Sequence, residues 1–241
     1  MTLSAGRIAE YALELIFPPR CMICLDIIPL DKPKWLCAEC DGLLEPIVNP
    51  CSRCGAPSAG GLCAECAGRP PLEYIRCNRS MYVYDAAAQR MIHNFKYNHH
   101  PEIARGLGTF VLNGGRLEYL RDADLIAYVP LHRKRLVKRG FNQAELFAKE
   151  ISAAAGLPLT HALRRERDTA PQFGFDYVSR HENIAGAFAA DGRLEIKNKR
   201  VIVIDDVCTT GATLNACAEV LMKNGAARVT AFTIAVAVKE I

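Results

Sequence analysis

One segment carries most of the structural information in this chain: Val201-Ile-Val-Ile-Asp205-Asp206-Val-Cys-Thr209-Thr210-Gly211-Ala-Thr213-Leu214. Its four apolar residues predict a buried strand with two carboxylates at the C-terminal end, and residues 209–213 open the next helix. Because a helix N-terminus offers free N–H groups, this turn and its threonine hydroxyls suit a monophosphate. The paired carboxylates suit ribose hydroxyls or hydrated Mg²⁺. The segment therefore predicts an anion site at the carboxyl end of a strand, where open α/β sheets bind ligands.

The sequence around this segment alternates between strand-like and helix-like stretches. Strands are predicted at residues 74–84, 125–129, 159–164, 200–204 and 228–238. Helices are predicted between them at residues 86–95, 102–112, 142–155 and 212–224. Strands that alternate with helices of about 10–15 residues imply a doubly wound, mostly parallel sheet, so the expected fold class is α/β.

The N-terminal part of the chain differs from the rest in its many cysteines. Eight of the eleven cysteines form four Cys-x-x-Cys pairs, and such knuckles aim two thiolates at one metal ion. A single pair could be a redox dithiol, but four clustered pairs favour two structural Zn²⁺ ions. The simplest assignment joins neighbouring pairs, and a cross-braced pairing stays open. The expected ligands are Cys21, Cys24, Cys37 and Cys40 for one ion and Cys51, Cys54, Cys63 and Cys66 for the other.

These patterns divide the chain into two predicted domains, residues 1–72 with an amphipathic N-terminal helix and the zinc sites, and residues 73–241 with the α/β sheet. The second domain carries 24 Lys/Arg against 18 Asp/Glu, so affinity for polyanions is expected there. No apolar run approaches the roughly 18–20 residues of a membrane span, and the N-terminus does not read as a secretory signal. With cysteine used for metal, we expect a cytoplasmic protein.

Residues 201–214 resemble the loop with which type I phosphoribosyltransferases bind 5-phosphoribosyl 1-pyrophosphate (PRPP), which has the form apolar–Asp–Asp–x–x–Thr–Gly–x–Thr. The resemblance implies that Asp205 and Asp206 hold the ribose hydroxyls, stabilise the cationic sugar during transfer, and act with Mg²⁺. It also implies that the 5-phosphate is held by Thr209, Thr210, Gly211, Ala212 and Thr213. Purine-salvage members usually carry an aspartate where this chain has Thr209, which argues against a purine-salvage activity.

A second group of candidate residues follows the predicted strand at 125–129. Five of the seven residues 133–139 are Lys or Arg, which we interpret as a basic loop before the helix that starts around Arg139. Such a loop taken alone is more often a solvated face. In the phosphoribosyltransferases, however, a loop at this place binds the pyrophosphate of PRPP. The resemblance thus implies that Arg133, Lys134 and Arg139 offset the charge of the leaving group.

Three features together make the chain similar to the ComF family (ComFC/GntX-like), which combines a double zinc ribbon with a type I phosphoribosyltransferase domain. They are the cysteine-rich N-terminus, the Arg-Gly-Phe-Asn-Gln run at residues 139–143, and the Gln, Arg, Asn and Phe residues spread over residues 172–188. The segment Phe95–His100 also resembles this family, and its histidines are interpreted as part of a polar loop between helices.

Two functions follow from this resemblance. The first is a PRPP-binding protein that transfers or recognises a phosphoribosyl group with Mg²⁺, and that is a phosphoribosyltransferase if it is active. The second is a single-stranded DNA-binding accessory protein of DNA uptake in natural competence, whose basic residues track phosphates. A helicase or another DNA-uptake protein would then be its partner. A PRPP-sensing regulator would keep the ligand without the reaction.

Overall fold

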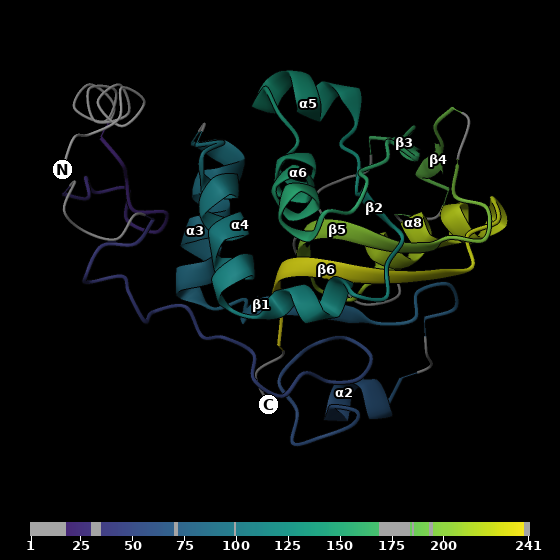
Figure 1. The fold of residues 1–241 in the computed structure, drawn as a ribbon, viewed down its shortest axis with the longest axis horizontal. Helices are drawn as coiled ribbons and strands as arrows, with labels where there is room; N and C mark the ends of the chain where they lie inside the picture. The colour runs from purple at the N-terminus through teal and green to yellow at the C-terminus, as the bar shows by residue number, and fades with distance from the viewer. Residues whose placement is uncertain are drawn as a thin grey trace.

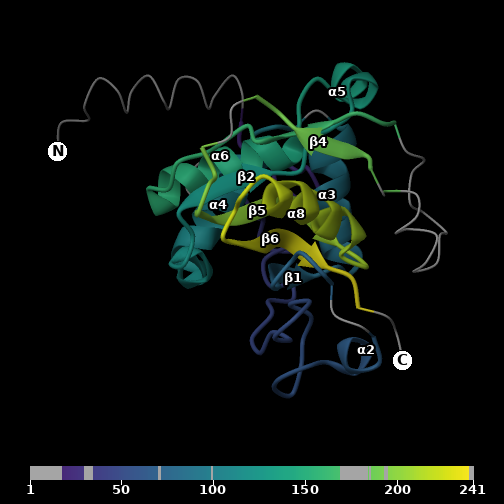
Figure 2. The same cartoon turned by 90° about the vertical axis from the view of Figure 1, so that its right-hand side faces the viewer.

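The computed structural model of the 241-residue chain describes residues 18–29, 35–69, 72–98, 100–168, 184, 186–192 and 195–238. The predicted N-terminal helix and residues 172–183 of the family signature lie outside these described residues. The described chain forms a parallel sheet with helices on both faces, and the cysteine-rich segment runs along one side of it (Figures 1 and 2).

The main sheet has the strand order β1-β6-β5-β2, and every neighbouring pair of strands is parallel. Its strands are β1 (Asn78–Val83), β2 (Leu125–Tyr128), β5 (Arg200–Cys208) and β6 (Arg228–Val236). The two central strands are buried along almost their whole length, which is typical of parallel sheets covered on both faces. The predicted α/β class with a mostly parallel sheet is therefore confirmed.

The sheet separates two hydrophobic layers, because side chains alternate between the faces of a strand. On β5, Ile202 and Ile204 pack into one layer, whereas Val201 and Val203 pack into the other. The first layer is covered by α3 (Ala86–Tyr97), α4 (Ile103–Asn113) and α6 (Gln143–Ala155), and the second by α8 (Ala212–Lys223). The carboxyl ends of the strands thus lie between helices of both layers.

Two short strands lie outside the main sheet and correct one expectation. Leu159 pairs with Ile126 through an isolated parallel bridge, and the chain then leaves the sheet. Leu163–Arg165 forms β3, which pairs antiparallel with β4 (Phe188–Ala190). The predicted strand in this region is therefore divided between a single bridge and a separate ribbon. A longer parallel strand would place charged Arg164 in a sheet that is buried on both faces.

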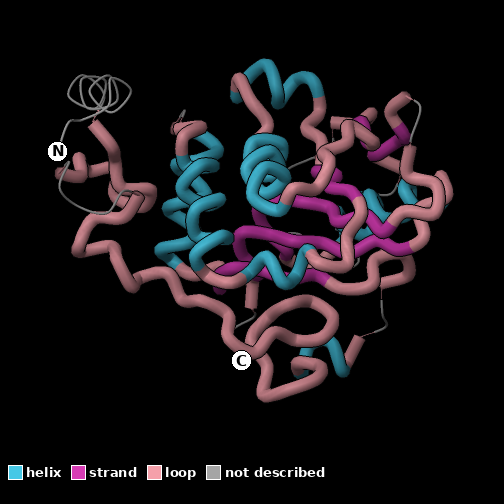
Figure 3. Tube along the Cα trace, in the orientation of Figure 1, coloured by secondary structure: helices cyan, strands magenta, loops and turns pink. Residues whose placement is uncertain are grey.

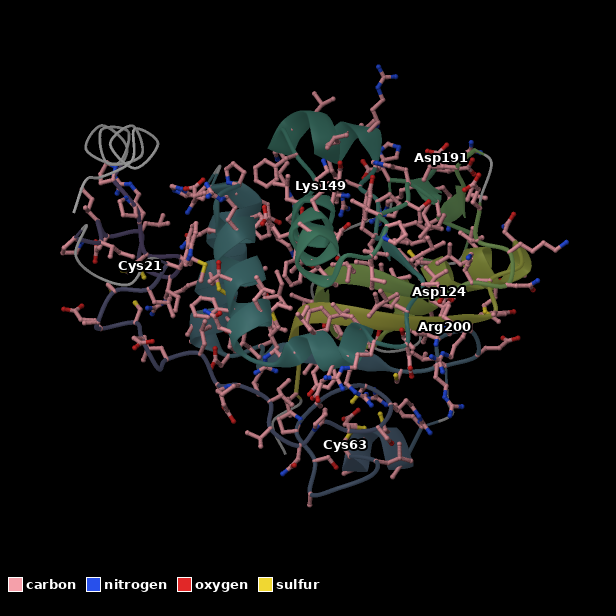
Figure 4. All side chains as sticks on the ribbon, viewed as in Figure 1. Cys21, Cys63, Asp124, Lys149, Asp191 and Arg200 are labelled. Carbon is pink, nitrogen blue, oxygen red and sulfur yellow. The ribbon has the colours of Figure 1, made fainter. Side chains whose placement is uncertain are left out.

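The amino-terminal ends of β2 and β5 are held together by an ion pair at the edge opposite the carboxyl ends (Figure 4). Arg200 donates from Nη2 and Nε to the two carboxylate oxygens of Asp124, at 2.8 and 3.1 Å. Hydrogen bonds from the side chain and the backbone of Arg200 lower the pKa of Asp124 below its ordinary value. The pair fixes the register between these two strands.

The remaining described elements are short: α2 (Ala64–Ala67), the 3₁₀ helix η1 (Arg116–Leu120) and α5 (Arg133–Arg139). The cysteine-rich segment is otherwise almost entirely loop (Figure 3). No helix in the described part of the chain is long and apolar enough to cross a membrane.

Candidate functional site

Two clusters of four cysteines stand at separate places beside the sheet, marked by Cys21 and Cys63 in Figure 4. Within each cluster the four sulfur atoms lie within 4.8 Å of one another. The Sγ atoms of Cys24 and Cys37 are 3.7 Å apart, as are those of Cys54 and Cys63. Thiolates bound tetrahedrally at about 2.3 Å from Zn²⁺ stand about 3.8 Å apart, so both clusters fit a zinc ion.

Each cluster consists of two neighbouring Cys-x-x-Cys pairs, which is the sequential arrangement and not the cross-braced one. Backbone N–H groups stabilise the thiolate form of one cysteine in each cluster, Cys21 and Cys51. Burial raises the pKa of Cys51, but N–H groups that include that of Cys63, whose nitrogen lies 3.3 Å from the Cys51 sulfur, lower it to about 6. A site closed by four thiolates leaves no open coordination position, so we assign both sites to structure rather than catalysis.

Each cluster is hydrogen-bonded to the α/β part of the chain by its own buried asparagine. Asn94 on α3 donates from Nδ2 to the carbonyl oxygens of Met22 and Ile23 in the first knuckle, at 3.0 and 2.9 Å. Asn78 at the start of β1 donates to the carbonyl oxygen of Cys54 in the second cluster, at 3.0 Å. Met22 and Ile23 pack in the same core as α3 and α4, so the first zinc site is part of that core.

Replacing Asn94 with alanine is expected to lower the free energy of unfolding by about 1–3 kcal/mol, because two buried carbonyl groups lose their donor. Urea denaturation followed by circular dichroism measures this loss. Asn113, which is exposed at the end of α4, gives the control variant Asn113→Ala, which should change stability by less than about 0.5 kcal/mol. Equal stability of the two variants would show that Asn94 does not hold the knuckle.

A cavity of about 540 Å³ opens at the carboxyl ends of β5 and β2. The loop after β5, the last turn of α3, helix α5 and the start of α6 all contribute to its wall. The charged residues of the wall are Lys96, Arg135, Lys138, Arg139, Arg165, Asp205 and Asp206. Because cations outnumber carboxylates, the cavity suits a ligand that carries several negative charges.

The loop between β5 and α8 has a backbone geometry that suits an anion. Helix α8 begins after Gly211, whose φ of +79° lies in the left-handed region that favours glycine. The first intrahelical bond runs from the N–H of Asn215 to the carbonyl of Gly211, so the preceding N–H groups point out of the helix end. Thr210 faces a second cavity, and its hydroxyl accepts from the N–H of Ala212 at 3.3 Å. The other predicted phosphate-binding residues line the first cavity: Thr209, Gly211, Ala212 and Thr213.

Asp205 and Asp206 lie inside β5, because the strand continues to Cys208. Asp206 forms an ion pair with Lys96 and accepts from Gln143 Nε2 at 3.3 Å. Burial acts to raise the pKa of Asp206, but the charge of Lys96 and its hydrogen bond lower it below the ordinary value. Burial, followed by the charge of Asp206, raises the pKa of Asp205 well above the ordinary value. Asp206 therefore ionises first, and Asp205 keeps its proton to higher pH.

Side chains from three helices surround Asp206, and the sequence predicts only Arg139 among them as a site residue. Gln143 on α6 accepts from Arg139 Nη1 on α5 at 2.6 Å. The guanidinium of Arg139 lies 5.0 Å from the ring centre of Tyr97, the residue next to Lys96 on α3. The sequence places Lys96 in a segment typical of the family, but no local signal pairs it with an aspartate far along the chain.

The basic residues after β2 form helix α5 instead of the predicted loop. At about 100° per residue, its cations divide between two faces. Of the three predicted pyrophosphate-binding residues, Arg139 lines the cavity, whereas Arg133 and Lys134 are exposed to solvent on the helix and are not part of the cavity wall described above. The cavity face carries Arg135, Lys138 and Arg139.

The carboxylate pair does not fit the predicted Mg²⁺ in the observed arrangement. The two oxygens of Asp206 accept from the N–H of Val207 and from Gln143, and Lys96 supplies the positive charge. Oδ1 of Asp205 accepts from the N–H of Asp206 at 2.8 Å. Mg²⁺ needs oxygen ligands in near-octahedral geometry and dehydrates reluctantly, so it would have to displace Lys96. Mg²⁺ therefore stays a prediction from the sequence.

The fold and these sites define a class of protein, a phosphoribosyltransferase-type α/β domain that carries a double zinc ribbon. Comparison with protein families agrees, because residues 12–67 match the double zinc ribbon domain and residues 142–239 match the phosphoribosyl transferase domain.

Comparison with individual proteins defines the family. The chain is 31% identical over 225 residues to the DNA utilization protein YhgH of Escherichia coli (strain K12), with 89% of this chain and 96% of that protein covered. It is 28% identical over 214 residues to competence protein F of Haemophilus influenzae, covering 86% and 92% of the two chains. It is also 28% identical over 213 residues to competence protein ComFC of Bacillus subtilis, covering 85% of each. The chain belongs to the ComF family.

Proposed function

We propose that this protein binds PRPP in the cavity at the carboxyl ends of β5 and β2. The observation that supports this most is that one cavity combines Thr209 and Gly211–Thr213 of the loop, the carboxylate pair and the cations of α5. The loop would hold the 5-phosphate through helix N–H groups and threonine hydroxyls. The carboxylates would hold the ribose hydroxyls. The cations on the cavity face of α5 would hold the pyrophosphate through charge-assisted hydrogen bonds.

We propose further that the site supports transfer of the phosphoribosyl group. The bond between C1 and the pyrophosphate oxygen breaks, the electron pair leaves with the pyrophosphate, and a nitrogen nucleophile forms the new bond to C1. The sugar becomes cationic in between, and the charged carboxylate of Asp206 would stabilise it. Thr209 stands where purine-salvage enzymes carry an aspartate, so we do not expect a purine as the acceptor.

Titration calorimetry with PRPP tests the assignment of the α5 faces. Replacing Arg135 and Arg139 together with glutamine is expected to weaken PRPP binding about 100-fold, because each charge-assisted hydrogen bond contributes about 1.5–3 kcal/mol. The matched control replaces Arg133 and Lys134 with glutamine, which removes the same charge from the exposed face, and should cost less than about fivefold. Equal losses would mean that α5 acts only through its total charge. Unchanged PRPP affinity in both variants would show that α5 takes no part in binding.

The exposed face of α5 supports a second candidate function, binding of single-stranded DNA. No residue of α5 is buried, and Val137 between the cations is 77% exposed. Arg133 and Lys134 could therefore contact polynucleotide phosphates without entering the cavity. The names of the relatives, a DNA utilization protein and competence proteins, agree with a role in handling DNA. We propose a helicase or another DNA-uptake protein as the partner in that role.

Measurement of single-stranded DNA affinity at two salt concentrations tests this second function. Replacing Arg133 and Lys134 with glutamine should weaken binding and flatten the salt slope by about 0.7 for each phosphate that the variant no longer neutralises. PRPP should leave DNA bound if DNA follows the exposed face, and should displace DNA if both use the cavity. Unchanged affinity and slope in the variant would contradict DNA binding at this face.

We place the protein in the cytoplasm for both functions. None of the eleven cysteines, all of which the structure describes, forms a disulfide, and eight of them form the two metal clusters. Thiolate zinc sites of this kind are typical of reducing compartments.

A further inference from the structure

We propose that Lys96 is the resident cation of the sugar subsite and takes the place that a divalent metal ion would occupy beside Asp206. The proposal rests on the proposed function, since it concerns the same cavity and a ligand of the sugar phosphate class. It goes beyond that function because it names a residue that binds the sugar and makes this subsite independent of metal.

The position of Lys96 is fixed from several directions. It stands in the last turn of α3, whose start is capped by Asp85, which accepts from the N–H of Ala88 at 2.8 Å. Asn94, two residues before Lys96, donates hydrogen bonds to the first zinc knuckle. Tyr97, directly after Lys96, lies under the guanidinium of Arg139. The ammonium group therefore reaches Asp206 from a helix end that is anchored on both sides.

The ion pair is shielded from water, and this makes it hard for a metal ion to replace. The side chain of Lys96 is 21% exposed and that of Asp206 is 8% exposed. Nε2 of Gln143 donates to Oδ2 of Asp206 at 3.3 Å, and this is the same oxygen that pairs with Lys96. A metal ion would have to lose its water and leave the lysine without a counter-charge, and breaking a buried pair in this way is costly.

Lys96 also faces the place where the ligand is expected, because it lines the cavity together with Asp205 and the phosphate loop. An ammonium group has three N–H donors and no acceptor. One donor serves Asp206, and the others are available to ribose hydroxyls or to a phosphate oxygen. Lys96 can thus do both tasks that a metal would do here, pairing with the charged carboxylate and binding ligand oxygens.

The first test uses Mn²⁺ as a paramagnetic probe on zinc-loaded protein in metal-free buffer without sugar phosphate. The wild-type protein should bind no Mn²⁺ through Asp206. Lys96→Met should gain one site, and Lys96→Met combined with Asp206→Asn should lose it again. The control Lys149→Met removes an exposed lysine of α6, labelled in Figure 4, and should behave as the wild type. Binding by the wild type that Asp206→Asn abolishes, or no gain in Lys96→Met, would overturn the proposal.

The second test uses ribose 5-phosphate, which has no pyrophosphate of its own to bind Mg²⁺. Wild-type affinity should be the same with and without Mg²⁺ within about threefold, whereas Lys96→Met should bind at least about tenfold more weakly without it, since a charged hydrogen bond is removed. Lys96→Arg keeps the charge and should retain most of the affinity, which separates loss of the cation from loss of folding. Strict dependence of the wild type on Mg²⁺ would overturn the proposal.

The two tests also separate this inference from the function on which it rests. Failure of the wild-type protein to bind PRPP under any condition would count against the proposed function. The Mn²⁺ titration needs no sugar phosphate, so it decides the role of Lys96 in either case.

Discussion

Replacing Cys21 with serine is expected to release one zinc ion and to lower the melting temperature of the whole chain by more than about 10 °C. Cys21 is fully buried, and its neighbours Met22 and Ile23, 1% and 3% exposed, pack in one core with Phe95 of α3. Structural zinc contributes about 10–16 kcal/mol in small zinc domains, whereas whole proteins have about 5–15 kcal/mol of stability. The loss of one ligand should therefore reach beyond the cysteine-rich segment into the sheet and its helices.

Elemental analysis and thermal denaturation of the same samples check this prediction. The control is Cys77→Ser, because Cys77 is partly exposed and belongs to neither metal cluster. It should keep two zinc ions and nearly the wild-type melting temperature. A Cys21→Ser protein that keeps two zinc ions and melts like the control would show that this cluster does not support the core.

Replacing Asp206 with asparagine is expected to cost roughly 2–4 kcal/mol of unfolding free energy, because it leaves the Lys96 ammonium without its counter-charge in a mostly buried place. PRPP binding should weaken by at least about tenfold, because the ribose hydroxyls lose a charged acceptor. Asp205→Asn makes the same atomic change one residue earlier. Because burial raises the pKa of Asp205, a neutral amide suits this buried place better than a carboxylate, and this variant should not lose stability. Urea denaturation and calorimetry give both quantities, and equal losses in the two variants would contradict the assignment of charge.

The pH dependence of the same two variants gives an independent check. The pKa of Asp205 is raised in the folded chain, so wild-type stability falls as the pH rises from the ordinary value of 3.8 through the folded one. Asp205→Asn removes this loss and should gain stability over the wild type near neutral pH but not in acid. The pKa of Asp206 is lowered, so its contribution is present above the ordinary pKa and is lost as the pH falls through the folded value. The defect of Asp206→Asn should therefore shrink in acid.

Features that depend on neighbouring residues could be predicted from the sequence. The segment at residues 201–214 specifies strand, turn and helix within one short run, and α8 begins at Ala212 as expected. The four Cys-x-x-Cys pairs likewise lie within one short segment, so the two groups of four cysteines could be predicted as zinc sites, although spacing alone leaves their pairing open. In both cases the chain between the interacting residues is too short for the tertiary fold to rearrange them.

Features that depend on the packing of distant elements could not be predicted. Helix α5 is seven residues long and has no buried face, so it lacks the apolar periodicity by which a helix is recognised. The ion pair of Lys96 with Asp206 joins the end of α3 to the end of β5, and only the sheet topology brings these ends together. The hydrogen bonds from Asn94 to the zinc knuckle could not be predicted for the same reason, because an asparagine in a helical sequence does not indicate which distant group it will bond.

Asn94 and Lys96 share one turn of α3, and the first bonds the zinc knuckle while the second bonds Asp206. With PRPP in the proposed site, metal and sugar phosphate would be linked in one thermodynamic cycle. Whatever factor zinc in the first cluster adds to the affinity for PRPP, PRPP must add the same factor to the affinity for that zinc ion. If zinc strengthens PRPP binding, a chain saturated with PRPP should lose this zinc ion to a chelator more slowly than a ligand-free chain.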